Sequence, residues 1–402
     1  MSVPEKAAGK MKITAIRPWI VQLPWSARPH RDPPSTDNMR ELLFTQIDTD
    51  EGVTGWGEVT TYPGVAGNRA VAHMIREVGE TIIGRDPAHI ERIWHDNVRS
   101  MTYVGTRGAV SATASAIDIA LWDIRGKVLD QPIFMLLGGP VRDRIALYTH
   151  PPRAEDTATA AEDAREIVAS GHRAFKFDPM MISIPEGNAH YIDGQITRKG
   201  MEDAWEMTAA IREAVGPSIE LLIDAHGKYN VPTAIDLCLG LEASNIFWFE
   251  EPVPVESNHA LRQVRERIHT KISVGERIFT RWEFIEIFEK ELADFIMPDV
   301  TWTGGISELK KISTLAESYY VPVSPHDASG PINVMAGAQV MMSVPNFYKL
   351  ETNTFDMSNY NRLIDQPLDV REGDLYLPDR PGLGVNLVPE ALAEFAIEGF
   401  AG

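Results

Sequence analysis

Seven ionisable side chains lie at the ends of short apolar runs in this sequence, where together they could do chemistry. They are Lys176, Asp224, Glu250, Glu276, Asp299, His326 and Glu351. One carboxylate at the end of a strand most often caps a helix or faces solvent. Three on consecutive strands repel one another and lose their solvation unless a cation neutralises them. The spacing therefore predicts a cation site beside groups that transfer protons.

The expected cation is Mg²⁺. Asp224, Glu250 and Glu276 offer only carboxylate oxygens, which are the ligands that this ion prefers. The chain contains one cysteine, Cys238, and no cluster of cysteine and histidine at zinc spacing, so a soft-metal site is not expected. In the stretch "FEEP", strand alternation turns Glu250 and Glu251 to opposite faces, so only one of them should bind the metal. We expect one Mg²⁺ per chain.

His326 is the expected general base. Asp299 and His326 end neighbouring apolar runs, and a carboxylate beside an imidazole fixes its tautomer and stabilises its cation. Lys176 should face this pair across the pocket, and Glu351 should close the ring of polar groups from the last strand. A histidine held in this way could remove a proton from a bound substrate.

A further histidine follows the first metal ligand in "LLIDAHGKYN". Strand period two turns His226 to the same side as Asp224, so the imidazole should project into the pocket above the metal. It could then act as a general acid toward a departing hydroxyl. The alternative is a loop histidine that makes a single hydrogen bond, which is the commoner case when these residues are considered by themselves.

The apolar runs recur about every 25 residues, with helical stretches between them. The eight runs are "RIALYTH", "AFKFD", "ELLIDAH", "IFWFEEP", "KISVGE", "DFIMPD", "VPVSPHD" and "FYKLE". Repeated units of one strand and one helix predict a closed β/α barrel, whose parallel strands are buried on both faces. The active site of such a barrel lies at the carboxyl ends of its strands. An open, doubly wound sheet is the alternative.

A different pattern precedes the barrel. Residues 1–10 read as a loose tail, and strands joined by a hairpin turn at 49–52 are expected before helices at about 67–83 and 89–99. Residues 111–130 form the clearest helix, because their apolar side chains recur at i, i+3, i+4, i+7 and i+11. The Pro and paired Gly of "QPIFMLLGGP" should end this segment and mark a domain boundary.

Composition limits the class of protein. Of the 402 residues 44% are hydrophobic, yet no apolar stretch approaches the roughly 20 residues that cross a bilayer. The formal net charge of -19 argues against a protein that binds nucleic acids, since such binding needs a basic surface. The start "MSVPEKAAGKMK" lacks a secretory h-region, and a lone cysteine forms no internal disulfide, so a cytoplasmic protein is expected.

These motifs resemble those of the enolase superfamily, in its mandelate racemase and muconate-lactonizing branch. The helix and hinge "ASAIDIALWDIRGKVLDQPIFMLLGG" and the strand ends "KFD", "IDAH", "FEEP", "GE", "PD", "PHD" and "LE" follow the family order over nearly the whole chain. The resemblance implies an α/β fold, with an α+β capping domain at 1–139 and a modified (β/α)₇β TIM-type barrel at 140–365. A C-terminal segment at 366–402 would return to the capping domain.

The chemistry that the resemblance implies is Mg²⁺-assisted removal of the proton next to a substrate carboxylate, which forms an enediolate. Such a proton is very weakly acidic, so preorganised positive charge in a dry pocket is what lowers the barrier. The implied roles are metal binding by Asp224, Glu250 and Glu276, proton removal by His326 with Asp299, polarisation of the substrate carboxylate by Lys176, and a hydrogen-bond donor or orienting group at that carboxylate in Glu351.

The chain departs from the family's racemases on one strand. They carry a second lysine where this chain has Asp178, in "KFD", so a two-base proton transfer is not expected. Asp178 could act as a base, but a hydrogen-bonding or structural role at the substrate suits a carboxylate-rich site better. The pattern "D-x-H-G" around His226 resembles that of the acid-sugar dehydratases of the D-galactonate dehydratase type. This favours His226 as the acid that protonates a departing 3-hydroxyl.

We therefore expect a Mg²⁺-dependent lyase that dehydrates an aldonate to a 2-keto-3-deoxy acid. A cycloisomerase or epimerase acting on a sugar acid or its lactone is the alternative, and a catalytically silent binding or regulatory protein on the same fold is a remote one. Assembly with further copies of the chain is also expected. Loops should set the choice of sugar acid, and the candidates for binding it are Arg28, His30, Arg31, Tyr62, Tyr103, His190 and Tyr191.

Overall fold

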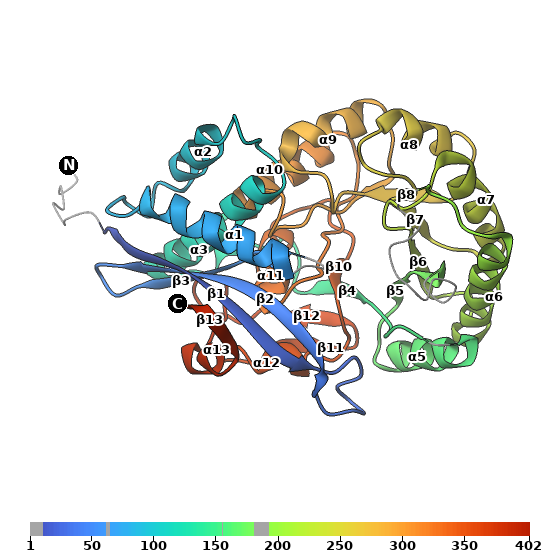
Figure 1. Ribbon diagram of the computed structural model, residues 1–402, viewed down its shortest axis with the longest axis horizontal. Coiled ribbons are helices and arrows are strands. Elements are labelled where there is room, and N and C mark those ends of the chain that lie inside the picture. Colours follow the sequence, from blue (N-terminus) through green and yellow to red (C-terminus); the bar gives the residue numbers. More distant parts are fainter. Residues whose placement is uncertain (1–10, 62–64, 155, 181–192) are drawn as a thin grey trace.

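The computed structural model describes residues 11–61, 65–154, 156–180 and 193–402. Its first part is an antiparallel sheet against which helices pack (Figure 1). The strands are β1 (Ile13–Trp25), β2 (Ser35–Thr49) and β3 (Thr54–Glu58), and the helices are α1 (Val65–Glu80), α2 (Ile90–Ser100) and α3 (Ala109–Leu129). The hairpin turn and the helices lie close to the ranges that the sequence predicts.

Helix α3 joins this capping domain to the barrel and is buried along most of its length. A Cβ atom on Gly57 of β3 would lie 2.0 Å from the carbonyl oxygen of Ala116, so only glycine lets the strand approach the helix this closely. Asp118 of α3 accepts hydrogen bonds from the N–H and the hydroxyl of Ser307, in the first turn of a barrel helix. The predicted signature helix is therefore a docking element, and the short α4 (Ile133–Leu136) follows it.

The barrel is a ring of parallel strands. Its strands β4 (Ile145–Thr149), β5 (Ala174–Phe177), β6 (Glu220–Asp224), β7 (Trp248–Glu250), β8 (Lys271–Val274) and β9 (Phe295–Ile296) pair each with the next. Single bridges then link Ile296 to Val323 and Val323 to Phe347, and β10 (Leu350–Thr352) pairs with β4. The ring is thereby closed, although "VPVSPHD" contributes an isolated bridge where a longer strand was predicted.

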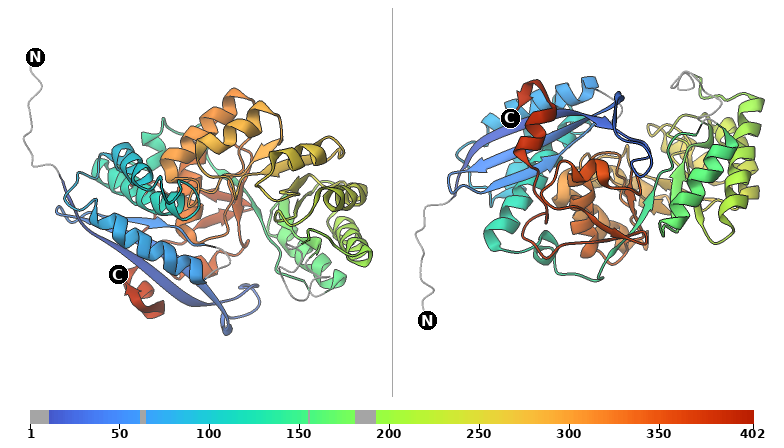
Figure 2. Two further views of the ribbon diagram at one scale, coloured as in Figure 1. Left: turned by 45° about the horizontal axis from the view of Figure 1, so that its top comes forward. Right: turned by 90° about the horizontal axis from the view of Figure 1, so that it is seen from below.

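Helices surround this ring on its outside (Figure 2). Between the eight strand positions of the described chain lie α5 (Thr157–Ala169), α6 (Arg198–Val215), α7 (Val231–Leu241) with the short η3 (Glu242–Ser244), α8 (Asn258–Arg265), α9 (Thr280–Glu289), α10 (Gly305–Ser318) and α11 (Pro331–Met342). The order of elements is that of a (β/α)₇β barrel, as the sequence predicts.

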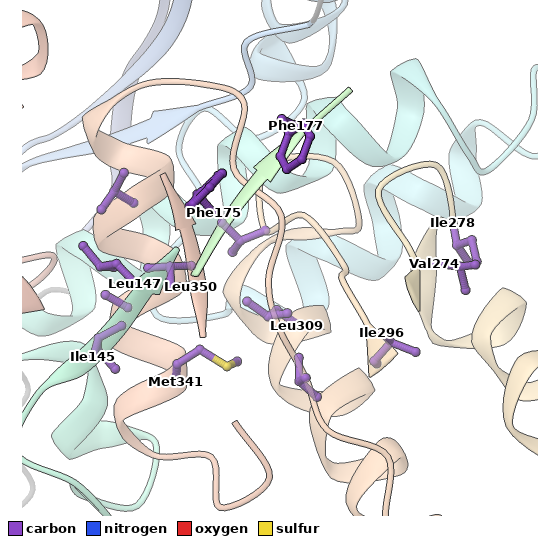
Figure 3. Packing of buried hydrophobic residues seen from close by; sticks show 14 of the residues in the cluster. Ile145, Leu147, Phe175, Phe177, Val274, Ile278, Ile296, Leu309, Met341 and Leu350 are labelled. Atoms are coloured by element: carbon purple, nitrogen blue, oxygen red, sulfur yellow. The ribbon is translucent and has the colours of Figure 1, made fainter. Parts of the chain in front are cut away.

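Strand alternation sorts the barrel side chains into two layers. Outward residues such as Phe175 and Leu350 pack with the surrounding helices (Figure 3). Ala174, Leu222 and Trp248 point into the barrel. Two residues further along the same strands, and nearer their carboxyl ends, Lys176, Asp224 and Glu250 point the same way. The charged groups therefore lie on an apolar plug, whose members are Tyr148, Ala174, Leu222, Trp248 and Phe295.

The C-terminal segment contacts both parts of the molecule (Figure 2). After α12 (Ser358–Asn361), β11 (Asp369–Arg371) and β12 (Asp374–Tyr376) form a hairpin that adds to β4 of the barrel. α13 (Pro389–Phe395) follows, and β13 (Ala396–Ala401) pairs with β1 of the cap. The segment predicted to return to the cap thus first extends the barrel sheet. Every helix among the described residues is too short or too polar to span a bilayer.

Candidate active site

A cavity of about 750 Å³ lies between the carboxyl ends of the barrel strands and the cap, a size typical of small-molecule sites. Small cap side chains, including Val71, Ala109 and Ala112, make one wall. The aromatic rings of Phe279 and Trp302 line the barrel wall. Among the polar groups singled out from the sequence, the cavity is lined by Lys176, Asp224, His226, Glu276, His326 and Glu351.

Three carboxylates meet in the floor of this cavity. Asp224 and Glu250 end β6 and β7, and Glu276 follows β8 by two residues. All three are buried, and one oxygen of each lies within 4.8 Å of the others. Glu251 is not part of this group, and the Arg277 guanidinium contacts both Glu251 and Glu276. A set of buried oxygen donors without thiol or imidazole fits Mg²⁺ and does not fit a soft metal.

The Lys176 ammonium balances part of this negative charge. Its Nζ lies 2.6 Å from Glu250 Oε1, 2.8 Å from Glu351 Oε1 and 3.5 Å from Asp224 Oδ2. Burial opposes the charge of the ammonium, but the three carboxylates outweigh burial and raise the pKa of Lys176. Burial and the charge of Asp224 raise the pKa of Glu250 well above its usual value. The carboxylates remain in excess, which is the situation that a divalent cation relieves.

His326 lies beside the three carboxylates, with both ring nitrogens facing acids. Nδ1 is 2.7 Å from Asp299 Oδ2, and Nε2 is 2.7 Å from Glu276 Oε2. Because an ionised carboxylate only accepts hydrogen bonds, Nδ1 donates to Asp299. Burial lowers the pKa of His326, but the charge of Glu351 and the hydrogen bond to Asp299 prevail and raise it. The ring of Trp302 packs against the imidazole with 5.2 Å between centroids.

His226 occupies a matching place beside Asp224. Its Nδ1 lies 3.1 Å from Asp178 Oδ2, and its Nε2 lies 3.4 Å from Asp224 Oδ2. β6 ends at Asp224, however, and His226 has a left-handed backbone with φ of 54°. The expected strand alternation is therefore wrong at this residue. A turn directs the ring to the cavity instead, and the His226 N–H holds this turn by donating to Asp224 Oδ1 at 2.7 Å.

Asp178 connects His226 to a nearby cation. Lys228 Nζ lies 2.9 Å from Asp178 Oδ2, the oxygen that also faces His226. Burial opposes ionisation, yet the hydrogen bonds and charges of His226 and Lys228 lower the pKa of Asp178. The backbone N–H of Met180 donates to the other oxygen at 2.9 Å. Asp178 is therefore an ionised acceptor with a fixed orientation.

The two histidines are arranged alike around the carboxylates. Each directs Nδ1 to an aspartate that follows the preceding strand and Nε2 to a carboxylate of the candidate metal site. His226 follows β6 and His326 follows the bridge at Val323, four positions further round the eight-strand ring. The two imidazoles therefore approach the cavity from opposite sides of the barrel.

His150 is a cavity residue that the sequence analysis did not single out. It follows β4, and its Nε2 contacts one oxygen of Glu351, while the Tyr148 hydroxyl donates to the other at 2.8 Å. Burial opposes ionisation of Glu351, but the charges of Lys176 and His326 hold its pKa well below the usual value. Glu351 accepts hydrogen bonds from its neighbours in this arrangement, and its role at the substrate carboxylate stays a prediction. His150 ends the run "RIALYTH", so the rule that selected the other strand ends could have found it.

Three cations on the cavity rim were also missed: Arg40, Lys228 and Arg277. The last two lie close in sequence to Asp224 and Glu276, so their positions could have been predicted. Arg40 belongs to the cap, where its guanidinium donates to the Ala328 carbonyl and stacks on the ring of Trp25 at 4.7 Å. Nothing in its sequence surroundings indicates that it reaches the cavity.

Of the loop residues predicted to bind substrate, Arg28, His30 and Arg31 do not line the cavity. Arg28 pairs with Asp163 of α5 at 2.5 Å, His30 Nε2 lies 3.0 Å from Glu166 of the same helix, and Arg31 contacts both acids. We correct the expectation for these residues, because the acids of α5 engage them and fasten the loop to the barrel. Of the remaining candidates, Tyr103 is fully exposed at the surface, and Tyr62, His190 and Tyr191 lie outside the described residues.

Both parts of the chain match a known family. Residues 15–138 match the mandelate racemase / muconate lactonizing enzyme N-terminal domain, and residues 159–391 match the family described as enolase C-terminal domain-like. The fold and the carboxylate-rich strand ends agree with these matches. The chain belongs to the enolase superfamily, in its mandelate racemase and muconate lactonizing enzyme branch.

Several named proteins resemble the chain over most of its length. It is 32% identical to a D-xylonate dehydratase of Haloferax volcanii, over 89% of this chain and 86% of the relative. It is 34% identical to a D-galactonate dehydratase family member of Streptomyces bingchenggensis, over 88% and 89%. The crystal structure of the 3,6-anhydro-D-galactonate cycloisomerase of Zobellia galactanivorans superposes with a TM-score of 0.82, at 28% identity, over 96% of this chain and 100% of that one.

Proposed function

We propose that this protein is a Mg²⁺-dependent acid-sugar dehydratase, which converts an aldonate to a 2-keto-3-deoxy acid. The observation that carries the proposal is the pair of histidines on opposite sides of the carboxylate cluster. Dehydration needs one group to remove the proton from C2 and another to protonate the hydroxyl that leaves C3. The relatives named xylonate and galactonate dehydratase support the same class of reaction.

Asp224, Glu250 and Glu276 would hold one Mg²⁺ at the ends of three adjacent strands. Mg²⁺ bound there supplies positive charge against which the substrate carboxylate can accumulate a second negative charge. The Lys176 ammonium adds a fixed positive charge on the same side, with its Nζ 2.6 Å from Glu250. The apolar plug beneath these groups excludes water from below, which strengthens both interactions.

His326 acts as the base in this mechanism. In its neutral form, with Nε2 released from Glu276, His326 removes the C2 proton through Nε2, and the C–H electron pair moves toward the substrate carboxylate to form an enediolate. Asp299 holds Nδ1–H, so Nε2 is the nitrogen that exchanges the proton, and the Asp299 charge stabilises the resulting imidazolium. The buried position of both groups keeps this geometry fixed between turnovers.

His226 acts as the acid. As the electron pair of the enediolate forms the C2–C3 double bond, the C3–O bond breaks and His226 gives its proton to the hydroxyl, which leaves as water. The enol that remains ketonises to the 2-keto-3-deoxy acid. Because the two imidazoles face the cavity from opposite sides, the proton and the hydroxyl leave opposite faces of the C2–C3 bond. The elimination is therefore anti, which restricts the C2 and C3 configurations of the substrate.

The rest of the sugar chain would extend toward the cap. Arg40, Lys228 and Asn353 line the cavity with groups that can donate hydrogen bonds, and the Trp302 ring offers a flat face for C–H groups. Small cap side chains such as Ala112 leave room for the chain. These residues, and not the predicted loop of Arg28 and His30, are our candidates for recognising the hydroxyls.

A cycloisomerase is the second candidate, because the structure named 3,6-anhydro-D-galactonate cycloisomerase covers almost the whole chain. Such a reaction shares the removal of a proton next to a carboxylate. It would differ after that step, since the product would be an isomer of the substrate. The chemical nature of the product therefore distinguishes the two.

The test is a panel of pentonic, hexonic and aldaric acids incubated with the protein and Mg²⁺. Release of a keto acid, measured as semicarbazone absorbance, is the expected result for at least one aldonate. A substrate that is consumed to a product of unchanged mass, without loss of water, would contradict dehydration and favour the cycloisomerase. Calorimetric titration with Mg²⁺ tests the metal assignment, because a folded sample that binds none would contradict it.

A further inference from the structure

Cap residue Glu58 lies at the junction of the two domains, at the end of β3 and fully buried. Its carboxylate accepts from the backbone N–H of Asn333 at 3.0 Å and from the Thr60 hydroxyl at 2.8 Å. A Cβ atom on Gly330 would lie 2.7 Å from Glu58 Oε1, so the carboxylate fills the space at the start of α11. Glu58 therefore holds the first turn of this barrel helix.

That first turn reaches the aspartate beside His326. Asn333 Nδ2 lies 3.3 Å from each oxygen of Asp299. An ionised carboxylate only accepts, so the NH₂ side of the amide must face it. The N–H and hydroxyl of Thr301 donate to Asp299 Oδ1 at 2.7 and 2.6 Å, which leaves Oδ2 directed at His326. Asn333 is thus one of the groups that set the direction of the Asp299 carboxylate.

We infer that Glu58 is a positioning residue for the His326–Asp299 pair, and that it acts from the capping domain through the first turn of α11 and the Asn333 side chain. The inference rests on the proposed function only in taking His326 as the base. Docking of the capping domain therefore orients the His326–Asp299 pair, in addition to covering the cavity.

The same cap segment supports His326 by a second contact. The indole N–H of Trp302 donates to the Thr60 carbonyl at 2.9 Å, and the Trp302 ring packs against the imidazole. Residues 58–60 of the cap therefore contact both the hydrogen-bonded side and the aromatic side of the base. A small displacement of this segment would reach His326 along either route.

Burial of an acid at a helix start does not by itself indicate such a role. Asp118 of α3 is buried in the same way and holds the first turn of α10 through Ser307. The Ser307 hydroxyl, however, bonds to Asp118 and to the Trp122 indole, which belong to the cap. Asn333 instead directs its side chain to the active site. Asp118 is therefore a matched control for cap docking without contact to the base.

The kinetic test compares Glu58→Ala, Glu58→Gln and Asn333→Leu with the control Asp118→Ala. Loss of an outer-shell partner typically lowers activity by about 10 to 100-fold, and we expect this loss in kcat for Glu58→Ala and Asn333→Leu, with little change in KM. Glu58→Gln should recover most of kcat, because its amide oxygen can still accept the Asn333 N–H. The deuterium isotope effect on kcat with 2-deuterated substrate should rise in the two impaired variants and stay unchanged in Asp118→Ala.

A spectroscopic readout needs no substrate. The Nδ1 proton between His326 and Asp299 should appear far downfield in the proton spectrum of protein labelled with ¹⁵N-histidine, and His326→Gln identifies it by its loss. We expect this signal to shift or vanish in Glu58→Ala and Asn333→Leu and to persist in Asp118→Ala. An unchanged signal in both variants, or an equal change in the control, would overturn the inference.

The two proposals fail in distinguishable ways. A wild-type protein that dehydrates no sugar acid contradicts the proposed function, and the proton spectra then decide the positioning role alone. If Glu58→Ala does not fold, Asn333→Leu keeps the test, because it leaves the Glu58 contact with the backbone of α11 in place. Circular dichroism and thermal melting establish folding for each variant.

Discussion

The two histidine–aspartate pairs of the cavity share one arrangement but are held differently. The His326 side chain is 5% exposed and lies 2.7 Å from Asp299, whereas the His226 side chain is 31% exposed and lies 3.1 Å from Asp178. Asp299 is fixed by backbone, hydroxyl and amide donors. Asp178 is shared between an imidazole and the ammonium of Lys228.

This difference suits the two steps of a dehydration. Removal of a weakly acidic proton needs a base in a fixed orientation, since misplacement by about 1 Å can cost on the order of 100-fold in rate. Protonation of a departing hydroxyl makes a smaller demand on orientation, and an acid that faces the open cavity can regain its proton from solvent. The more rigid pair is therefore assigned to C2 and the more open pair to C3.

The largest effect is expected for His326→Asn. Loss of the general base should lower kcat by about 10³-fold or more, while the substituted amide preserves much of the side-chain volume. Mg²⁺ affinity should change little, because the three carboxylates remain. Keto-acid release and calorimetry measure the two quantities. Turnover near the wild-type rate would remove His326 as the base.

A somewhat smaller effect is expected for His226→Gln. Without the acid the hydroxyl must leave unassisted, so keto-acid formation should fall by about 10²-fold or more. The turn should survive in this variant, because it is held by the backbone N–H of residue 226, which still donates to Asp224. A variant that forms keto acid as fast as the wild type would return His226 to a structural role.

Asp178→Asn should have an intermediate effect. The amide cannot stabilise the positive charge of His226 or Lys228, so kcat should fall by about 10-fold, as is typical of an outer-shell partner. A matched Asp299→Asn should lower kcat further. The pair with His326 is buried, so this substitution leaves the His326 charge without a nearby counter-charge. Equal losses in the two variants would contradict the difference drawn between the pairs.

The smallest expected effect is on thermal stability, and it concerns Glu58, the cap residue beside the His326–Asp299 pair. Burial raises the pKa of Glu58 to about 7 and that of Asp118 to about 7 as well. The folded protein holds these protons more tightly than the unfolded chain, so the stabilisation is present below about pH 4.5 and is lost as the pH rises through 7. The melting temperature of the wild type should therefore fall relative to that of Glu58→Gln between pH 5 and 8. A pH-independent difference between them would contradict the raised pKa.

Much of the fold and the chemical site followed from the sequence, since one rule covers both. Buried parallel strands appear as apolar runs, and the polar residue after each run lies at the carboxyl end where the site forms. This rule leads to the carboxylates and to His326. It would also have led to His150, which ends the first run.

Contacts between distant segments were beyond this rule. The loop with Arg28 and His30 has the composition of a ligand-binding loop, but α5 offers Asp163 and Glu166 at the right place to engage it. Glu58 and Asn333 are 275 residues apart in the chain, and no local pattern joins them. Strand alternation predicted that His226 faces the cavity, but the strand ends at Asp224, before this residue. The turn with a left-handed His226 directs the side chain to the same place.

The division of labour between the two histidines is the central claim, and hydrogen exchange at C2 tests it most directly. Wild type, His326→Asn and His226→Gln are each incubated with a turned-over aldonate and Mg²⁺ in D₂O, and deuterium at C2 of the recovered substrate is measured by NMR. We predict that His226→Gln still exchanges the C2 proton although it forms little keto acid, and that His326→Asn does neither. Exchange by His326→Asn, or its loss in a folded His226→Gln, would contradict the assignment.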